Sequence, residues 1–152
     1  ADVTVLSRSL KKAETAKSLG ASRTLATSEE GFFDNHRGEF DFILNTISAD
    51  LDVDSYMRLL KPRGVMAVVG LPPERQNVHF ASLLMGWAVP TGSNIGGLKA
   101  TQEMLDFCAE HGVIPQVEMI TGEDITTAYD NIVDSRVRYR YVIDTSTFPQ
   151  TA

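Results

Sequence analysis

The 152-residue sequence has a single cysteine, Cys108, and no apolar run long enough to cross a membrane. One cysteine excludes an internal disulfide framework and a cysteine-rich zinc site. The first residues lack the basic start and the long apolar stretch of a secretory signal peptide. Positive charge is also scarce, and the net charge of −6 argues against a nucleic-acid partner. These absences favour a reducing, cytoplasmic setting.

What the sequence does contain is the composition of a globular domain, with 43% hydrophobic and 22% charged residues. Strand-like runs alternate with helical patterns, which predicts an α/β fold with a mostly parallel sheet. We expect strands at 3–7, 23–27, 41–46, 64–70, 88–94, 114–120 and 140–145. We expect helices at 10–19, 51–60, 79–86, 97–111 and 123–133, and a short helix or loop over 28–38.

The first 21 residues are the most informative segment. Val3–Leu6 has the pattern of a short buried strand, Ser7 and Arg8 form its polar end, and an amphipathic helix follows over Leu10–Leu19. In a dinucleotide-binding fold this is the second strand, whose end meets the adenosine ribose. The glycine-rich turn and the first strand of such a fold would precede Ala1. We therefore interpret the sequence as part of an enzyme.

The end of this strand also indicates which nucleotide is bound. An NAD enzyme carries a carboxylate there, which accepts hydrogen bonds from the ribose hydroxyls. Here the position is Ser7-Arg8, and a guanidinium suits the additional phosphate of NADP. Lys11 and Lys12 oppose the dipole at the start of the helix, which a nearby anion would explain. The alternative interpretation is a solvated basic helix start without a ligand.

Two further strand ends carry candidate binding groups. Asn45, Thr46 and Ile47 end one predicted strand, and 69–71 end the next. Ligands of open α/β sheets lie at the carboxyl ends of the strands, where the backbone of 69–71 suits a nicotinamide carboxamide. The apolar side chains there are first of all core residues. A glycine-rich helix entry follows at 91–97, which either holds an anion or simply forms a turn.

Four segments taken together resemble one family. They read VTVLSRSLKKAETAKSLGA, FDFILNTISADLDVDSYMRLLKPRGVMAVVGLPPE, TGSNIGG and VRYRYV. In this order they are similar to the cinnamyl alcohol dehydrogenase group of the zinc-dependent medium-chain alcohol dehydrogenases. The resemblance covers nearly the whole chain. It implies an incomplete Rossmann-type, doubly wound parallel sheet, without the first strand and the glycine-rich turn, plus a closing α/β segment.

The resemblance also implies NADP as the cofactor and a set of residues that contact it. They are Ser7, Arg8 and Lys12 at the 2′-phosphate, Thr46 and Ile47 on the adenosine side, Val69, Gly70 and Leu71 at the nicotinamide, Ser93 and Ile95 at the carboxamide, and Arg138 near the pyrophosphate. Residues 1–112 would form the partial NADP-binding domain. Residues 113–152 would form the segment that in the family packs back on the catalytic domain.

The family's zinc ligands and proton relay lie in an amino-terminal domain that these residues do not include. The resemblance therefore implies neither catalytic nor metal-binding residues here, and we expect the chain alone to be inactive. The parent enzyme would interconvert a small alcohol and an aldehyde by hydride transfer with NADP and zinc. It would form a homodimer through the edge strand Val89–Ile95. The alternatives are a zinc-free quinone or enoyl reductase of the same superfamily, and a non-catalytic nucleotide-binding or structural fragment.

This interpretation leaves a gap in the sheet. In the doubly wound strand order, the first strand lies between the second and the fourth, here Val3–Ser7 and Asp41–Thr46. Without it the gap spans two strand spacings, ~9.6 Å, which is too wide for hydrogen bonds. Unpaired buried backbone groups are costly. We expect another segment to fill the gap, or the two strands to close together or to swap between copies.

Overall fold

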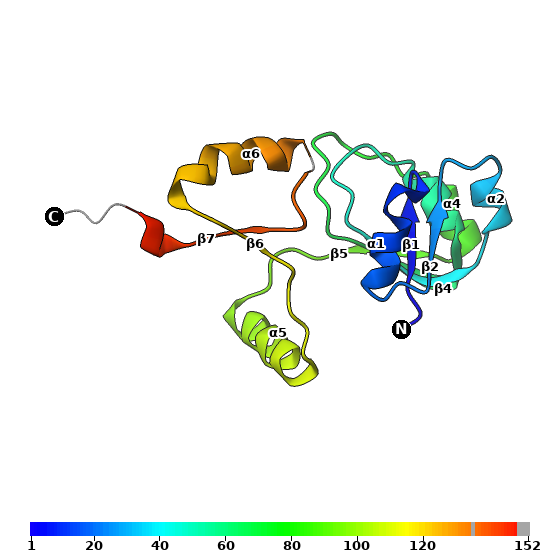
Figure 1. Cartoon of the computed structure of the whole chain (residues 1–152). Coiled ribbons are helices and arrows are strands. Elements are labelled where there is room, and N and C mark those ends of the chain that lie inside the picture. Colours follow the sequence, from blue (N-terminus) through cyan, green and yellow to red (C-terminus); the bar gives the residue numbers. More distant parts are fainter. Residues whose placement is uncertain (135, 149–152) are drawn as a thin grey trace. The chain divides into compact units, whose positions relative to one another are not determined.

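The computed structural model describes residues 1–134 and 136–148 (Figure 1). The chain forms two compact units, Ala1–Ile95 and the part from Gly96 onward, and each is described by itself. Every strand pair in both units is parallel, and helices lie between successive strands, so the predicted α/β class is confirmed. No helix in the described ranges is long and apolar enough to span a membrane. The division at residues 112 and 113 stays a prediction.

The first unit contains two separate parallel sheets. One pairs β1 (Thr4–Ser7) with β2 (Arg23–Ala26), and the other has the order β3 (Phe40–Asn45), β4 (Leu60–Val68), β5 (Val89–Gly92). The helical segments of this unit are η1 (Leu10–Lys12), α1 (Ala13–Ser18), α2 (Phe32–Asn35), α3 (Val53–Arg58) and α4 (Phe80–Gly86). Each predicted strand and helix of this unit is present, with ends shifted by a few residues.

One hydrophobic core holds the first unit together. Leu59 and Met66 are fully buried at the junction of α3 and β4, and Phe32 of α2 packs into the same cluster. Leu6 of β1 and Leu25 of β2 pack against this cluster, so both sheets share it. Burial of side chains of this size contributes ~1.5–3 kcal/mol each. The core thereby fixes the strands whose carboxyl ends carry the candidate site.

The start of β4 differs from the prediction. We expected a helix to Leu60 and a turn at 61–63, but the helix ends at Arg58 and the strand begins at Leu60. The β3–β4 register shifts between Phe40 and Phe42, which is a bulge. Arg63 has a φ of 66°, and its N–H donates to the Trp87 carbonyl oxygen at 3.1 Å. The strand therefore continues through the predicted turn because the bulge absorbs the extra residues.

The strands on either side of the predicted gap do not pair with each other. Within the described residues, β1 pairs only with β2, and β3 pairs on one side only, with β4. Of the outcomes that we expected, closure of these two strands onto each other is therefore wrong for the single chain. Insertion of another segment between them and exchange of strands between copies both stay predictions.

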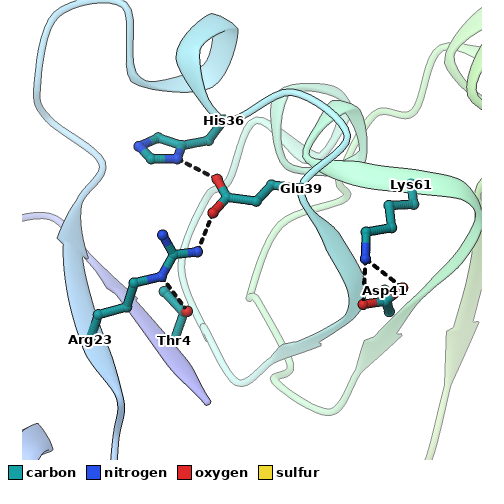
Figure 2. Close-up of polar contacts among 6 residues, drawn as sticks. All are labelled: Thr4, Arg23, His36, Glu39, Asp41 and Lys61. Carbon is teal, nitrogen blue, oxygen red and sulfur yellow. Dashed lines mark hydrogen bonds and ion pairs between the residues drawn. The ribbon is translucent and has the colours of Figure 1, made fainter. Parts of the chain in front are cut away.

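A polar network connects the two sheets at the amino ends of their strands (Figure 2). The Arg23 Nε donates to Thr4 Oγ1 at 2.9 Å, and the guanidinium forms an ion pair with Glu39. The His36 Nδ1 lies 2.5 Å from the second carboxylate oxygen of Glu39. Separately, Lys61 bridges to Asp41 at 2.8 Å. Both Lys61 and Asp41 are exposed, so this second pair adds little stability.

The network makes stability depend on the ionisation of Glu39. The hydrogen bond from Arg23, followed by that from His36, lowers the pKa of Glu39 below its ordinary value of 4.5. A lowered folded-state pKa adds stability that is complete above the unfolded pKa and is lost as pH falls through the folded value. We expect Glu39→Gln to cost roughly 0.5–1 kcal/mol near pH 7, because exposed ion pairs are screened.

Urea unfolding of the wild type and of Glu39→Gln near pH 7 and near pH 3 measures this effect. The difference in unfolding free energy should shrink toward the lower pH. Glu14→Gln is the control, because Glu14 is exposed on α1 and has no ion pair within the described residues. An equal difference at both pH values would contradict the predicted role of Glu39.

The second unit contains α5 (Leu98–His111), β6 (Glu118–Ile120), η2 (Gly122–Asp124), α6 (Ile125–Val133), β7 (Tyr141–Ile143) and η3 (Thr145–Thr147). β6 and β7 pair in parallel, with Glu118 opposite Tyr141. Thr121 and Asp124 form a reciprocal capping box at the start of η2, and the hydrogen bonds from Thr121 lower the pKa of Asp124. The predicted strands 114–120 and 140–145 are thus present but shorter.

Candidate functional site

The carboxyl edge of the β3–β4–β5 sheet brings together predicted site residues from three segments. The Asn45 carbonyl oxygen at the end of β3 accepts hydrogen bonds from the N–H groups of Val69 at 2.9 Å and Gly70 at 3.1 Å. The Asn45 Oδ1 accepts from the Ile47 N–H at 2.9 Å. The Ser93 N–H donates to the carbonyl oxygen of Val68, the last residue of β4, at 3.2 Å. This edge is where open parallel sheets bind ligands.

Gly70 lies directly against the backbone of Ile47. A β-carbon at Gly70 would be 2.2 Å from the Ile47 carbonyl oxygen and 2.6 Å from its carbonyl carbon. No side chain fits there, so the loops after β3 and β4 touch backbone to backbone. Thr46, Ile47 and Val69 are exposed beside this contact, and their groups are accessible to a ligand.

The same two loops are tied together farther along. The Gln76 Oε1 accepts from the Leu51 N–H at 3.0 Å, and the Gln76 Nε2 donates to Asp50 Oδ1 at 3.1 Å. The Asp54 carboxylate accepts from the His79 N–H at 3.1 Å. At the start of α3, hydrogen bonds from Ser55 lower the pKa of Asp52, which caps the helix. The contacts of Gln76 and His79 connect the chain after β4 to the chain after β3, whereas the Ser55–Asp52 pair stabilises only the start of α3.

A second cluster lies at the carboxyl end of β1. Ser7 is half-buried, while Arg8 and Lys12 are exposed. The Ser7 carbonyl oxygen accepts from the Thr27 N–H at 2.7 Å, and the Arg8 carbonyl oxygen accepts from Ser28 Oγ at 2.6 Å. The main chain of Ser7 and Arg8 is therefore anchored, whereas their side chains remain accessible.

The charges of this cluster suit an anion. η1 has lysines and no acidic residue, and its N-cap Ser9 makes no capping hydrogen bond. Within the described part of the chain, neither the Arg8 guanidinium nor the Lys12 ammonium forms an ion pair. Because the chain as a whole carries a net charge of −6, an accessible group of unpaired cations is a local exception. These residues fit the phosphate of a dinucleotide.

Two predicted residues of the first unit lie outside both clusters, and a third belongs to the second unit. Leu71 and Ile95 belong to the first unit and are 85% and 94% exposed. Arg138 belongs to the second unit, where its N–H donates to Glu118 Oε1 at 2.8 Å and its side chain is exposed. The roles of all three stay predictions. Among the described residues, no group of three or more His, Cys, Asp or Glu side chains is arranged to hold a metal ion.

Two residues that shape the site are not among the predicted site residues. The sequence places Asn45 at the end of a strand, and it places Ser28 in a polar segment that is either a short helix or a loop. The signal for Asn45 was present, because asparagine after a strand commonly accepts a hydrogen bond from the N–H two residues later. The bond from Ser28 to Arg8 spans 20 residues, and no local pattern indicates it.

The sequence of the chain is similar to those of known dehydrogenases. The sequence profile of the family described as zinc-binding dehydrogenase matches residues 1–110. An NADP-dependent alcohol dehydrogenase C of Mycolicibacterium smegmatis is 53% identical over 146 residues, which are 96% of this chain and 42% of the relative. A probable formaldehyde dehydrogenase of Bacillus subtilis is 49% identical, over 97% of this chain and 42% of its own length. The chain thus spans less than half the length of these relatives.

Solved structures of alcohol dehydrogenases are also similar to this chain. A cinnamyl alcohol dehydrogenase from Sorghum bicolor matches with a TM-score of 0.90 at 32% identity, over 99% of this chain and 43% of that structure. A cinnamyl alcohol dehydrogenase from Helicobacter pylori, solved in complex with NADP(H), matches with a TM-score of 0.81 at 35% identity, over 96% and 42%. The incomplete doubly wound fold and the predicted kind of cofactor agree with these similarities.

Proposed function

Because this chain belongs to the zinc-binding dehydrogenase family, we propose that it is the carboxy-terminal, cofactor-binding part of a longer NADP-dependent alcohol dehydrogenase. The observation that carries the proposal is the anchored Ser7-Arg8 segment with accessible, unpaired cations at the end of β1. The proposal is also supported by relatives whose names include NADP-dependent alcohol dehydrogenase. The substrate class would be small alcohols and aldehydes.

Each cluster would have a separate task in cofactor binding. Ser7, Arg8 and Lys12 would hold the 2′-phosphate, with Arg8 able to donate two parallel charged hydrogen bonds. The backbone of Val69–Leu71 would orient the nicotinamide ring beside an apolar wall. Bound NADPH supplies the hydride for the reaction. Zinc, held by residues outside this chain, would polarise the substrate oxygen.

Arg8 should determine the preference for NADPH over NADH. In the longer protein, we expect Arg8→Ala to weaken NADPH binding roughly tenfold to a hundredfold, the cost of losing charged hydrogen bonds worth ~1.5–3 kcal/mol. NADH lacks the phosphate, so its affinity should barely change. Titration of both nucleotides, monitored by the fluorescence of the reduced nicotinamide, measures the two effects. Lys17→Ala is the control for the loss of one positive charge, because Lys17 is exposed on α1, the helix that follows this cluster.

Equal losses for NADPH and NADH in Arg8→Ala would contradict the 2′-phosphate assignment. A wild-type longer protein that oxidises no alcohol with NADP and reduces no aldehyde with NADPH would contradict the proposed activity. We expect the 152-residue chain alone to show no turnover.

We also propose that the longer enzyme forms a homodimer through β5. All residues of β5 are exposed, and within the described residues this strand pairs only with β4, so its other edge is open. Because the Ser93 N–H points to β4, backbone alternation turns Pro90 toward the open edge. Pro90 has no N–H to donate there, so a second copy would pair through the other backbone groups of this edge, such as the Gly92 N–H. An open edge favours pairing with a two-fold copy. Sedimentation of the longer protein at high concentration should show a dimer. A monodisperse monomer would contradict the proposed homodimer.

A further inference from the structure

Asn45 is one of two buried polar residues in the described structure, with 8% of its surface exposed. It ends β3 and makes three hydrogen bonds to the loops at the candidate site. Its Oδ1 accepts from the Ile47 N–H at 2.9 Å, and its carbonyl oxygen accepts from the N–H groups of Val69 and Gly70. One residue thus joins the loop after β3 to the loop after β4.

The side-chain bond and the close approach at Gly70 depend on each other. The Oδ1 bond to the N–H two residues later is the bond of an Asx turn, and it holds Ile47 beside the end of β3, where its backbone meets Gly70. The contact leaves no room for a β-carbon at Gly70. If the Oδ1 bond is lost, the turn can relax and Ile47 can move away from Gly70. The backbone of Val69–Leu71, which would face a nicotinamide, would then lose the contact that positions it.

We propose that Asn45 is a positioning residue for the cofactor: through its Oδ1 it fixes Ile47 against Gly70 and thereby sets the backbone of Val69–Leu71 at the nicotinamide. Asn45 itself touches neither cofactor nor substrate in this role. The inference rests on the proposed function, because it assigns Asn45 to the same site.

The experiment compares Asn45→Ala with Asn45→Asp in the longer protein. Alanine removes the acceptor, whereas aspartate keeps an oxygen within reach of the Ile47 N–H. We expect Asn45→Ala to raise the KM for NADPH about tenfold and to lower kcat about tenfold, because a misplaced nicotinamide binds and reacts poorly. Asn45→Asp should stay within about threefold of the wild type in both constants.

Ser55→Ala is the matched control. Ser55 is the other buried polar residue, and it hydrogen-bonds to Asp52 at the start of α3 rather than to the site loops. This variant should lower the melting temperature but leave the KM for NADPH and kcat unchanged. If Ser55→Ala changes the kinetics as much as Asn45→Ala does, the effect is general destabilisation and the inference is wrong. The inference is equally wrong if aspartate fails to rescue.

Hydrogen exchange in the absence of nucleotide separates this inference from the proposed function. The Ile47 amide should exchange faster in Asn45→Ala than in the wild type, and unchanged exchange would refute the structural part. If the wild type binds no NADPH, the proposed function fails, and the assignment of Asn45 to it fails too. If the wild type and Asn45→Ala bind NADPH equally well, only the inference about Asn45 is overturned.

Discussion

Gly70→Ala should weaken the binding of NADPH to the longer dehydrogenase about a hundredfold. The new β-carbon would lie 2.2 Å from the Ile47 carbonyl oxygen, whereas real β-carbon contacts are essentially never below 3.0 Å. The obstacle is backbone, so no side chain can rotate away to make room. The two loops must separate by ~1 Å, which breaks the hydrogen-bonding geometry that this segment would offer the nicotinamide. A loss of ~3 kcal/mol of such contacts corresponds to roughly a hundredfold in affinity.

Gly86→Ala provides the control for this substitution. A β-carbon at Gly86 meets only the Ala88 β-carbon at 4.0 Å, which is ordinary contact, and Gly86 ends α4 away from the site loops. Circular dichroism should first establish that both variants are folded, and isothermal titration with NADPH then gives the two affinities. Binding by Gly70→Ala within about threefold of the wild type would show that the backbone contact has no part in cofactor binding.

The alternation of strands and helices was predictable because it depends on local patterns. The run FDFILN predicts β3, and the apolar spacing after Asp52 predicts α3, without reference to the rest of the chain. The bulge at the start of β4 was not predictable. It depends on the pairing of Phe42 with Val65, and a proline and a glycine between two elements normally indicate a turn.

The candidate site also has features that the sequence predicts and features that only the folded structure explains. The sequence predicts that Ser7-Arg8 binds a phosphate, because a basic residue replaces the expected carboxylate at a recognisable strand end. The resemblance also places Gly70 at the nicotinamide, but the sequence does not explain why a glycine is needed there, since a glycine after a strand usually ends it. A glycine is needed at position 70 because its backbone contacts Ile47, 23 residues earlier in the chain. Only the folded arrangement of β3 and β4 produces that contact.

The 152-residue chain alone should bind NADP(H) more weakly than about 100 μM, although it contains all the contact residues predicted above. A dinucleotide's pyrophosphate normally binds at a glycine-rich turn and a helix N-terminus, and these residues contain no G-x-G-x-x-G sequence. What remains is a set of exposed cations, whose attraction physiological salt screens. Micromolar affinity measured by calorimetry at that ionic strength would contradict this prediction.

The lack of a strand between β1 and β3 should also be detectable in the chain alone, at the unpaired edges of these two strands. Hydrogen bonds from Ser22 and Thr27 go to the carbonyl oxygens of Val3 and Ser7. Alternation along β1 therefore turns the amides of Thr4 and Leu6 away from β2. In β3, Asn45 bonds toward β4, so the amides of Phe42 and Leu44 point away from β4.

Hydrogen exchange should distinguish the chain alone from the longer protein at these four amides. In the chain alone they should exchange almost freely, because no strand of the described structure pairs with β1 or β3 on that side. A strand inserted between β1 and β3 would pair with both edges. It should slow exchange there roughly a thousandfold, which corresponds to an opening free energy of ~4 kcal/mol. The amides of Val5 and Ile43 face partner strands in either protein and serve as internal controls. Strong protection of Thr4, Leu6, Phe42 and Leu44 in the chain alone would mean that no strand is needed between β1 and β3, and the weak binding of NADP(H) would then require another cause.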